Sequence, residues 1–260
     1  MSTKVILISI DGMRPEGALQ CGNPFIKKLM ESGTYTLQGQ TVMPSVTLPC
    51  HTSMFYSLVP QRHGILTNTY TPPVRPVDGI VESLHRAGKT CGAFFNWEPI
   101  RHLWKTETMT YSSFIDSEVE PTSDELLTDA AIALIKRNQP DFLFLYMVET
   151  DNKGHRFRWM SKEYLEQISL AFENVKRIVD HVDGDCHVIV TTDHGGHSYT
   201  HGTDSPEDMT IPMFFLGKRF VPGQVLTEAS ILDIAPTVAD LMDVEIPKDW
   251  LGQSRLPKNI

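Results

Sequence analysis

The sequence is poor in cysteine, in positive charge and in long apolar runs, and each shortage excludes a class of protein. Its four cysteines form no CxxC pair, which argues against a disulfide scaffold or a cysteine zinc site and is typical of a reducing compartment. Lys and Arg number 23 against 32 Asp and Glu, so the basic surface that nucleic-acid polymers require is missing. No apolar run approaches the ~20 residues of a membrane span, and the run at 5–10 is too short for a signal-peptide core. We therefore expect a soluble cytoplasmic protein that binds neither a nucleic-acid polymer nor a membrane.

Glycine and proline, 17 of each among 260 residues, are close to average usage, so disordered and collagen-like chains are excluded. The length fits one sizeable domain or two small ones. The sequence has no internal repeat and no break in composition that indicates a linker. We therefore expect a single domain over residues 1–260, with a lid or a small insertion in its least regular stretch, 96–121. The oligomeric state is left open.

Short apolar runs alternate with segments of helical periodicity along the chain. The predicted strands are 5–10, 34–42, 90–95, 141–148, 187–191 and 211–216. The predicted helices are 24–31, 48–58, 77–87, 122–135, 161–182 and 232–242. A capping box at 122–125 begins the fourth helix, and Ser161 caps the fifth, which is the clearest amphipathic segment. Alternating strands and helices predict an α/β fold with a mostly parallel sheet, whose continuous apolar strands are buried on both faces.

Three of the predicted strands run directly into residues of the kind that bind metals. These residues are Asp11; Asp151 and His155; and Asp193 and His194, followed by His197 and His201. Ligands of open α/β sheets bind beyond the carboxyl ends of the strands, so these distant segments are expected to converge. Carboxylates mixed with imidazoles favour Zn²⁺, Mn²⁺ or Fe²⁺ over Ca²⁺, and the set is large enough for two ions. Taken alone, each of these residues is better explained as a turn or structural residue than as a metal ligand. Their joint occurrence in one chain favours a metal site.

Thr47 precedes a predicted helix, and the free N–H groups and dipole of a helix N-terminus favour an incoming anion. A threonine hydroxyl beside a metal ion loses its proton more easily and becomes a usable nucleophile. The alternative for Thr47 is an ordinary helix N-cap.

Three elements occur in one order along the chain: T-x-P-x-H at 47–51, E-x-D-x-x-G-H at 149–155 and T-D-H-G at 192–195. In this they resemble the alkaline phosphatase superfamily, and within it the type I phosphodiesterase/nucleotide pyrophosphatase family. The resemblance implies a three-layer sandwich with helices on both faces of the sheet. It also implies a two-metal hydrolase of small phosphate esters, mainly phosphodiesters, that forms a covalent phospho-threonine. The metals implied are zinc, with manganese as the alternative.

The resemblance also implies a role for individual residues. Asp11, Thr47, Asp193 and His194 would hold one metal ion, and Asp151, His155 and His201 the other, with His197 as the alternative to His201. Thr47 would attack phosphorus, and Asn68 would donate a hydrogen bond to a phosphoryl oxygen.

The chain departs from the family at Leu48, where an aromatic residue often stacks on a nucleotide base. This departure weakens the expectation of a nucleotide substrate. Tyr70, Trp97 and Trp104 are the aromatic residues that could line a pocket instead. The chain is also shorter than typical members, which favours a more open site and small or exposed substrates.

Several other functions remain open. Sulfatases are excluded because the Cys or Ser followed by P-x-R is missing, and phosphoglycerate mutases because there is no room for their inserted domain. A phosphonate hydrolase would have the same ligands. A phosphomonoesterase would need a cationic clamp, for which Arg14, Arg62 and Arg101 are the candidates. Outside the superfamily, the chain could be a non-catalytic metal- or phosphate-binding protein, or an α/β interaction module.

Overall fold

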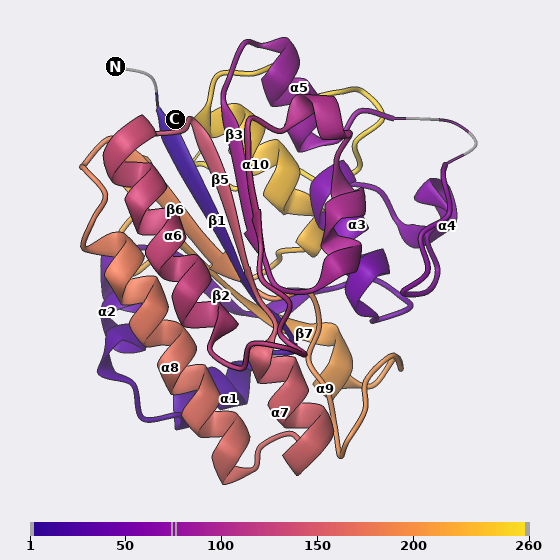
Figure 1. Ribbon diagram of the computed structural model, residues 1–260, viewed down its shortest axis with the longest axis vertical. Coiled ribbons are helices and arrows are strands. Elements are labelled where there is room, and N and C mark those ends of the chain that lie inside the picture. The colour runs from indigo at the N-terminus through magenta and orange to yellow at the C-terminus, as the bar shows by residue number, and fades with distance from the viewer. Residues whose placement is uncertain (1–2, 74, 76, 258–260) are drawn as a thin grey trace.

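The computed structural model describes residues 3–73, 75 and 77–257, which build a seven-stranded sheet (Figure 1). The strands are β1 (Lys4–Ile10), β2 (Thr34–Gln40), β3 (Cys91–Phe95), β4 (Tyr111–Phe114), β5 (Phe142–Met147), β6 (Cys186–Thr191) and β7 (Thr210–Leu216). Their order in the sheet is β2-β7-β6-β1-β5-β3-β4. The five strands from β6 to β4 are parallel, while β7 is antiparallel to both β6 and β2. The fold is therefore α/β with a mostly parallel sheet, as predicted.

Helices cover both faces of the sheet (Figure 1). One face carries α1 (Pro15–Gln20), α2 (Pro24–Ser32), α6 (Ser123–Asn138) and α8 (Lys162–Val179); the other carries α3 (Thr47–Tyr56), α5 (Ile80–Arg86) and α10 (Ile234–Leu241). Two further helices, α7 (Glu149–Phe157) and α9 (Pro206–Met209), lie at the end to which β1 points. The short helices are α4 (Pro60–His63), η1 (Glu98–Leu103), η2 (Thr106–Thr108) and η3 (Ile231–Asp233).

Each face of the sheet packs into its own apolar core, because successive side chains of a strand point to opposite faces. In β5, Phe144 and Tyr146 pack with Phe55 of α3, whereas Leu143 and Leu145 join the core on the side of α8. All six residues of β5 are buried. Burial on both faces accounts for the continuous apolar run from which this strand was predicted.

The register of the three central strands determines where the chemistry lies. Ile10 pairs with Met147 of β5, and Ser9 pairs with Thr191 of β6. The ladder continues one residue further, where the Asp11 N–H donates to the Met147 carbonyl at 3.0 Å. The strand ends of β6, β1 and β5 therefore lie side by side at the same edge.

The predicted strands and helices are all present, with ends shifted by a few residues. Ser161 caps α8, as expected, by accepting a hydrogen bond from the Tyr164 N–H. The capping box at 122–125 is wrong: Thr122 is the N-cap of α6, but its hydroxyl donates to the Glu120 carboxylate at 2.7 Å instead. The Thr122 backbone, with φ −100° and ψ 19°, is also not extended as at an ordinary N-cap, and its side chain makes no capping hydrogen bond. Seven short or polar elements were not predicted from the sequence: α1, α4, α7, α9, η1, η2 and β4.

The irregular stretch 96–121 is joined to the sheet. It contains η1 and η2, and its strand β4 pairs in parallel with β3 at the sheet edge. Within the described residues, no helix has the length and apolar character needed to cross a bilayer.

We predict that Phe144→Ala lowers the free energy of unfolding by about 3–5 kcal/mol, because it leaves a cavity in the central strand. The Phe144 ring is fully buried and contacts Phe55 edge-on, with ring centroids 4.9 Å apart. Urea denaturation followed by circular dichroism measures the change. Leu170→Ala, at a side chain that is 49% exposed on α8, is the control and is expected to cost well under 1 kcal/mol. Equal losses in the two variants would contradict this description of the core.

Candidate metal-binding and catalytic site

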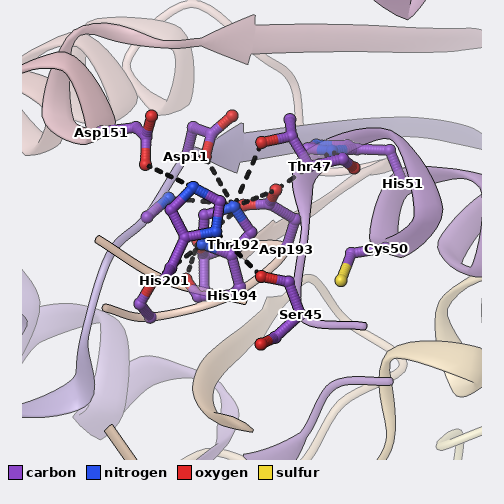
Figure 2. A network of polar contacts seen from close by, with 12 residues as sticks. Asp11, Ser45, Thr47, Cys50, His51, Asp151, Thr192, Asp193, His194 and His201 are labelled. Carbon is purple, nitrogen blue, oxygen red and sulfur yellow. Dashed lines mark hydrogen bonds and ion pairs between the residues drawn. The ribbon is translucent and has the colours of Figure 1, made fainter. Parts of the chain in front are cut away.

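One group of metal-type side chains comes from the ends of β1 and β6 (Figure 2). Asp11 follows β1, and Asp193 and His194 follow β6; all three are fully buried. The His194 Nε2 atom lies 3.1 Å from Asp193 Oδ2 and 3.5 Å from Asp11 Oδ1. One ligand atom from each residue lies within 4.8 Å of the others, which is close enough for them to share one ion.

A second group comes from α7 and from the loop after β6. Asp151 and His155 stand four residues apart in α7 and so share one face of the helix. His155 Nε2 is 3.3 Å from Asp151 Oδ2, and His201 Nε2 is 3.8 Å from Asp151 Oδ1. These three side chains also offer ligand atoms within 4.8 Å of one another. The two groups adjoin, because the His194 and His201 rings stack with centroids 3.8 Å apart.

The imidazoles of both groups are held in the same way. The Nδ1–H of His155 donates to the Tyr199 carbonyl at 2.9 Å, and that of His201 to the Ser45 carbonyl at 2.9 Å. His194 makes the corresponding bond, 2.8 Å long, to the Gly195 carbonyl. A proton fixed on Nδ1 leaves a lone pair on Nε2, which is the form of histidine that binds a metal ion.

The carboxylates carry buried oxygen atoms that no donor reaches. Among the described residues, Asp11 Oδ1, Asp151 Oδ1 and Asp193 Oδ2 are buried without a hydrogen-bond partner. Burial and the neighbouring charges of Asp193 and Asp151 raise the pKa of Asp11 well above its usual range. Burial opposes ionisation of Asp193 too, but His194 and His51 outweigh it and lower the pKa of Asp193.

Unpartnered, buried carboxylate oxygens are costly unless a cation balances them. The donor set of carboxylates with imidazole lone pairs suits a divalent transition metal. The residues present therefore fit two metal ions, one beside Asp11, Asp193 and His194 and one beside Asp151, His155 and His201.

Thr47 is the first residue of α3 and is nearly buried. Its Oγ1 lies 3.2 Å from His194 Nε2, so the hydroxyl is directed at the first group (Figure 2). Asn68 lies beside the same helix start, and its Oδ1 accepts the Leu48 N–H at 2.9 Å. This bond fixes the side chain of Asn68, whose NH₂ group has no hydrogen-bond partner among the residues that the structure describes.

A buried layer behind the first group orients it. The Tyr146 hydroxyl donates to Asp11 Oδ2, which leaves Oδ1 of that carboxylate free. His51 Nδ1 lies 2.9 Å from the Thr47 carbonyl and 3.4 Å from Asp193 Oδ2, and its Nε2 meets the Ser9 hydroxyl at 2.9 Å. His51 therefore connects the start of α3 to the ends of two strands.

The Trp159 indole holds the metal-type segments against one another. Its Nε1–H donates to the Gly12 carbonyl at 2.9 Å, next to Asp11. A Cβ atom built on Gly154 would lie 2.6 Å from the indole, and one built on Gly196 would lie 2.2 Å from it. Glycine at these two positions is therefore required for the ring to approach.

Some of the candidates lie elsewhere. His197 turns away from both groups, with its Nδ1 2.8 Å from Asp208 Oδ1, so His201 and not His197 adjoins Asp151. Tyr70 stacks on His102, and Trp104 packs in the core with Phe55 and Phe95.

The three arginine candidates are engaged in contacts with other groups. Arg14 contacts Glu16 and the Gly196 carbonyl, Arg62 lies 3.9 Å from Asp249, and Arg101 pairs with Glu98 at 2.7 Å. None of the three is among the described residues that line the cavity next to the two groups.

A cavity of about 320 Å³ opens beside the two groups. Its lining includes Asp11, Thr47, Asn68, Asp151, His155 and His201. Trp97 and other residues of the stretch 96–121 line another part of it. The predicted site residues other than Asp193 and His194 therefore line one hollow that admits a small molecule.

Tyr146, His51 and Trp159 were not assigned roles from the sequence. The strongest missed signal is the pair Gly154 and Gly196, because a required glycine indicates a close neighbour. Tyr146 gave no signal, since it looks like one more apolar residue of a buried strand.

Comparison with known proteins identifies relatives. The family model described as type I phosphodiesterase/nucleotide pyrophosphatase matches residues 5–210. Human ectonucleotide pyrophosphatase/phosphodiesterase family member 1 is 26% identical over 216 residues, which cover 73% of this chain and 23% of that protein. The venom phosphodiesterase of Macrovipera lebetinus is 25% identical over 218 residues, covering 74% of this chain and 25% of that protein. The chain thus spans about a quarter of the length of these curated relatives.

Solved structures share the fold at low sequence identity. Murine ectonucleotide pyrophosphatase/phosphodiesterase 5 superposes with a TM-score of 0.79 at 16% identity, covering 96% of this chain and 97% of that one. The phosphonate monoester hydrolase of Silicibacter pomeroyi also gives 0.79 at 16% identity, covering 97% of this chain and 76% of that one.

We predict that Asp151→Asn lowers the bound zinc from two ions per chain toward one, because an amide oxygen replaces a charged ligand of the second group. Inductively coupled plasma mass spectrometry of the zinc-reloaded protein measures the stoichiometry. The control is Asp204→Asn, at an exposed position in the loop after His201. Normal stoichiometry in Asp151→Asn would remove Asp151 from the ligand set.

We also predict that Gly196→Ala displaces Trp159 and weakens metal binding by about tenfold or more, since the support of ligand side chains has effects of this size. Competition with a chromogenic chelator measures zinc affinity, and thermal unfolding measures folding. The control is Gly184→Ala, where an added Cβ meets nothing within 4 Å. Unchanged zinc affinity in a folded Gly196→Ala protein would show that Trp159 does not organise the site.

Proposed function

The chain belongs to the type I phosphodiesterase/nucleotide pyrophosphatase family of the alkaline phosphatase superfamily, and from this premise we propose that it hydrolyses small phosphodiesters through a covalent phospho-threonine at Thr47. One observation carries the proposal: the Thr47 hydroxyl stands at a helix N-terminus, 3.2 Å from His194, in a cavity lined by both groups of metal-type side chains.

The proposed reaction has two displacements at phosphorus. In the first, a bond forms between Thr47 Oγ1 and phosphorus while the bond to the leaving alcohol breaks, and the alcohol departs with a proton. In the second, water adds its oxygen to phosphorus, and Thr47 leaves and regains its hydroxyl proton. The Asn68 NH₂ group, free because its Oδ1 accepts the Leu48 N–H, would donate to a phosphoryl oxygen in both steps.

The metal ligands follow the two groups. Asp11, Thr47, Asp193 and His194 would hold one divalent ion, and Asp151, His155 and His201 the other, with zinc proposed and manganese as the alternative. When bound, such ions favour ionisation of the Thr47 hydroxyl and neutralise charge that develops on phosphoryl oxygens.

The lack of a cationic side chain in the described lining of the cavity favours a diester over a monoester as the substrate. Among the described residues that line it, none is Lys or Arg. A phosphomonoester carries one more negative charge than a diester, and phosphatases commonly hold that charge with a cationic clamp. The relatives support a small phosphorus-containing substrate, since one solved structure is an inactive variant of the murine family member 5 in complex with AMP. A cytoplasmic location stays a prediction.

We expect metal-reloaded protein to hydrolyse bis(p-nitrophenyl) phosphate at least about tenfold faster, as kcat/KM, than p-nitrophenyl phosphate, because no cationic side chain holds the extra charge. Thr47→Ala should lower diester hydrolysis by about a thousandfold or more and leave the protein folded. The control is Thr227→Ala, at an exposed threonine outside the cavity.

Other outcomes separate the alternatives. Substantial diester hydrolysis by Thr47→Ala would make water the nucleophile, and preference for the monoester would indicate a phosphatase. Inactivity on both esters with two metals bound would contradict the proposal and favour a phosphonate substrate or a non-catalytic role.

A further inference from the structure

The second metal group depends on a loop for both of its imidazoles. The structure describes every residue of 192–205, and this segment contains no helix and no strand of the sheet. It carries His201, and the Tyr199 carbonyl in the same segment accepts the His155 Nδ1–H at 2.9 Å. In the first group, by contrast, Asp11 and Asp193 lie within two residues of strand ends. Contacts that fix the loop therefore decide the geometry of the second group more than that of the first.

The Asp208 carboxylate holds this loop at two points. Asp208 is fully buried, and its Oδ1 accepts the His197 Nδ1–H at 2.8 Å. Its Oδ2 accepts both the N–H of Thr203 at 2.9 Å and the Thr203 hydroxyl at 2.7 Å. Burial opposes ionisation of Asp208, but the bonds from His197 and Thr203 outweigh it and lower its pKa. Because these two partners flank His201 in the sequence, one carboxylate fixes the loop on both sides of that residue.

Ser45 ties the same loop to the segment in front of α3 (Figure 2). This serine is fully buried, and its hydroxyl donates to the Thr203 carbonyl at 2.7 Å. Its own carbonyl accepts the His201 Nδ1–H at 2.9 Å, so two bonds of opposite direction join Ser45 to the loop. Thr203 is therefore held by Asp208 through its N–H and hydroxyl and by Ser45 through its carbonyl.

We propose that Asp208 and Ser45 are positioning residues, which hold the loop so that both imidazoles of the second metal group face Asp151. His197 serves the site as an anchor of the loop and not as a metal ligand. This inference rests on the ligand sets given under the proposed function. The result of the positioning is visible at His201, whose Nε2 lies 3.8 Å from Asp151 Oδ1. Residues behind a metal ligand commonly change metal affinity by about 10–100-fold.

The test is a zinc titration of metal-stripped protein in competition with a chromogenic chelator, which gives the affinity for each of two ions. In Asp208→Asn the single amide oxygen replaces two carboxylate oxygens, so it cannot serve His197 and Thr203 at once. The affinity for the more weakly held zinc ion should fall by about tenfold or more, while the affinity for the other should change less than about twofold.

A second background identifies which group is weakened. Asp151→Asn disables the second group and leaves the first group to bind zinc. Adding Asp208→Asn to this protein should leave the affinity for the remaining zinc ion unchanged, because the first group does not use the loop's imidazole. A general loss of structure would instead weaken the remaining ion as well, so this readout separates positioning from a merely structural role.

Matched controls come from the opposite side of the fold, around η3. Asp233 is another buried carboxylate that accepts backbone N–H groups, and Asp233→Asn should lower the thermal unfolding temperature but leave both zinc affinities at their native values. Ser45→Ala should weaken only the second group, by about threefold or more. Its control is Ser57→Ala, since Ser57 is also fully buried and its hydroxyl donates to the Leu232 carbonyl at 2.7 Å.

Thr203→Val keeps the test open should Asp208→Asn fail to fold, because this exposed residue loses only its hydroxyl bond to Asp208. It should weaken the second group by about threefold or more. Native affinity for both zinc ions in the folded variants, or an equal loss at both groups, would overturn the inference and leave the phosphodiesterase function intact. If the native protein binds fewer than two zinc ions, the ligand sets of the proposed function fail together with the inference.

Discussion

The structure depends on bringing three buried carboxylates together in one site. Asp11, Asp151 and Asp193 each keep an oxygen atom that no donor of the described residues reaches, and their charges repel one another. Such an arrangement is unfavourable in itself, so the fold has to enforce it. Enforcement comes from the sheet: the paired ends of β6, β1 and β5 are adjacent, and backbone hydrogen bonds fix their register. The imidazoles are then aimed by bonds to backbone carbonyls, and Thr47 is presented by the first turn of α3.

The fold and much of the site could be predicted because the relevant signals are local. A buried parallel strand is a continuous apolar run, and the residue after it lies at the edge where ligands bind, so Asp11 and Asp193 could be placed without coordinates. The helix α7 was missed because Glu149–Phe157 is short and polar, although Asp151 and His155 share one face only when that segment is helical. The choice of His201 over His197 as a metal ligand could be made only from the resemblance to the family. The distance of either histidine from Asp151 depends on how the loop after β6 folds.

The parts that escaped prediction depend on contacts between distant segments. The bond from Trp159 to Gly12 spans 147 positions, and that from Tyr146 to Asp11 spans 135. No periodicity or spacing encodes such a partner. The capping box predicted at Thr122 was wrong for the opposite reason. The local sequence pattern was strong, but an equally local group, the Glu120 carboxylate, accepts a hydrogen bond from the Thr122 hydroxyl.

The distribution of the metal-type residues along the chain has a consequence for biosynthesis. They begin at Asp11 and end at His201, so that most of the 260 residues must leave the ribosome before either group is complete. Until β6 pairs with β1, and the loop bearing His201 closes over α7, a nascent chain offers only isolated ligands of low affinity. Metal acquisition is therefore a late event in the synthesis of the chain, and it is coupled to the folding that brings the ligands together.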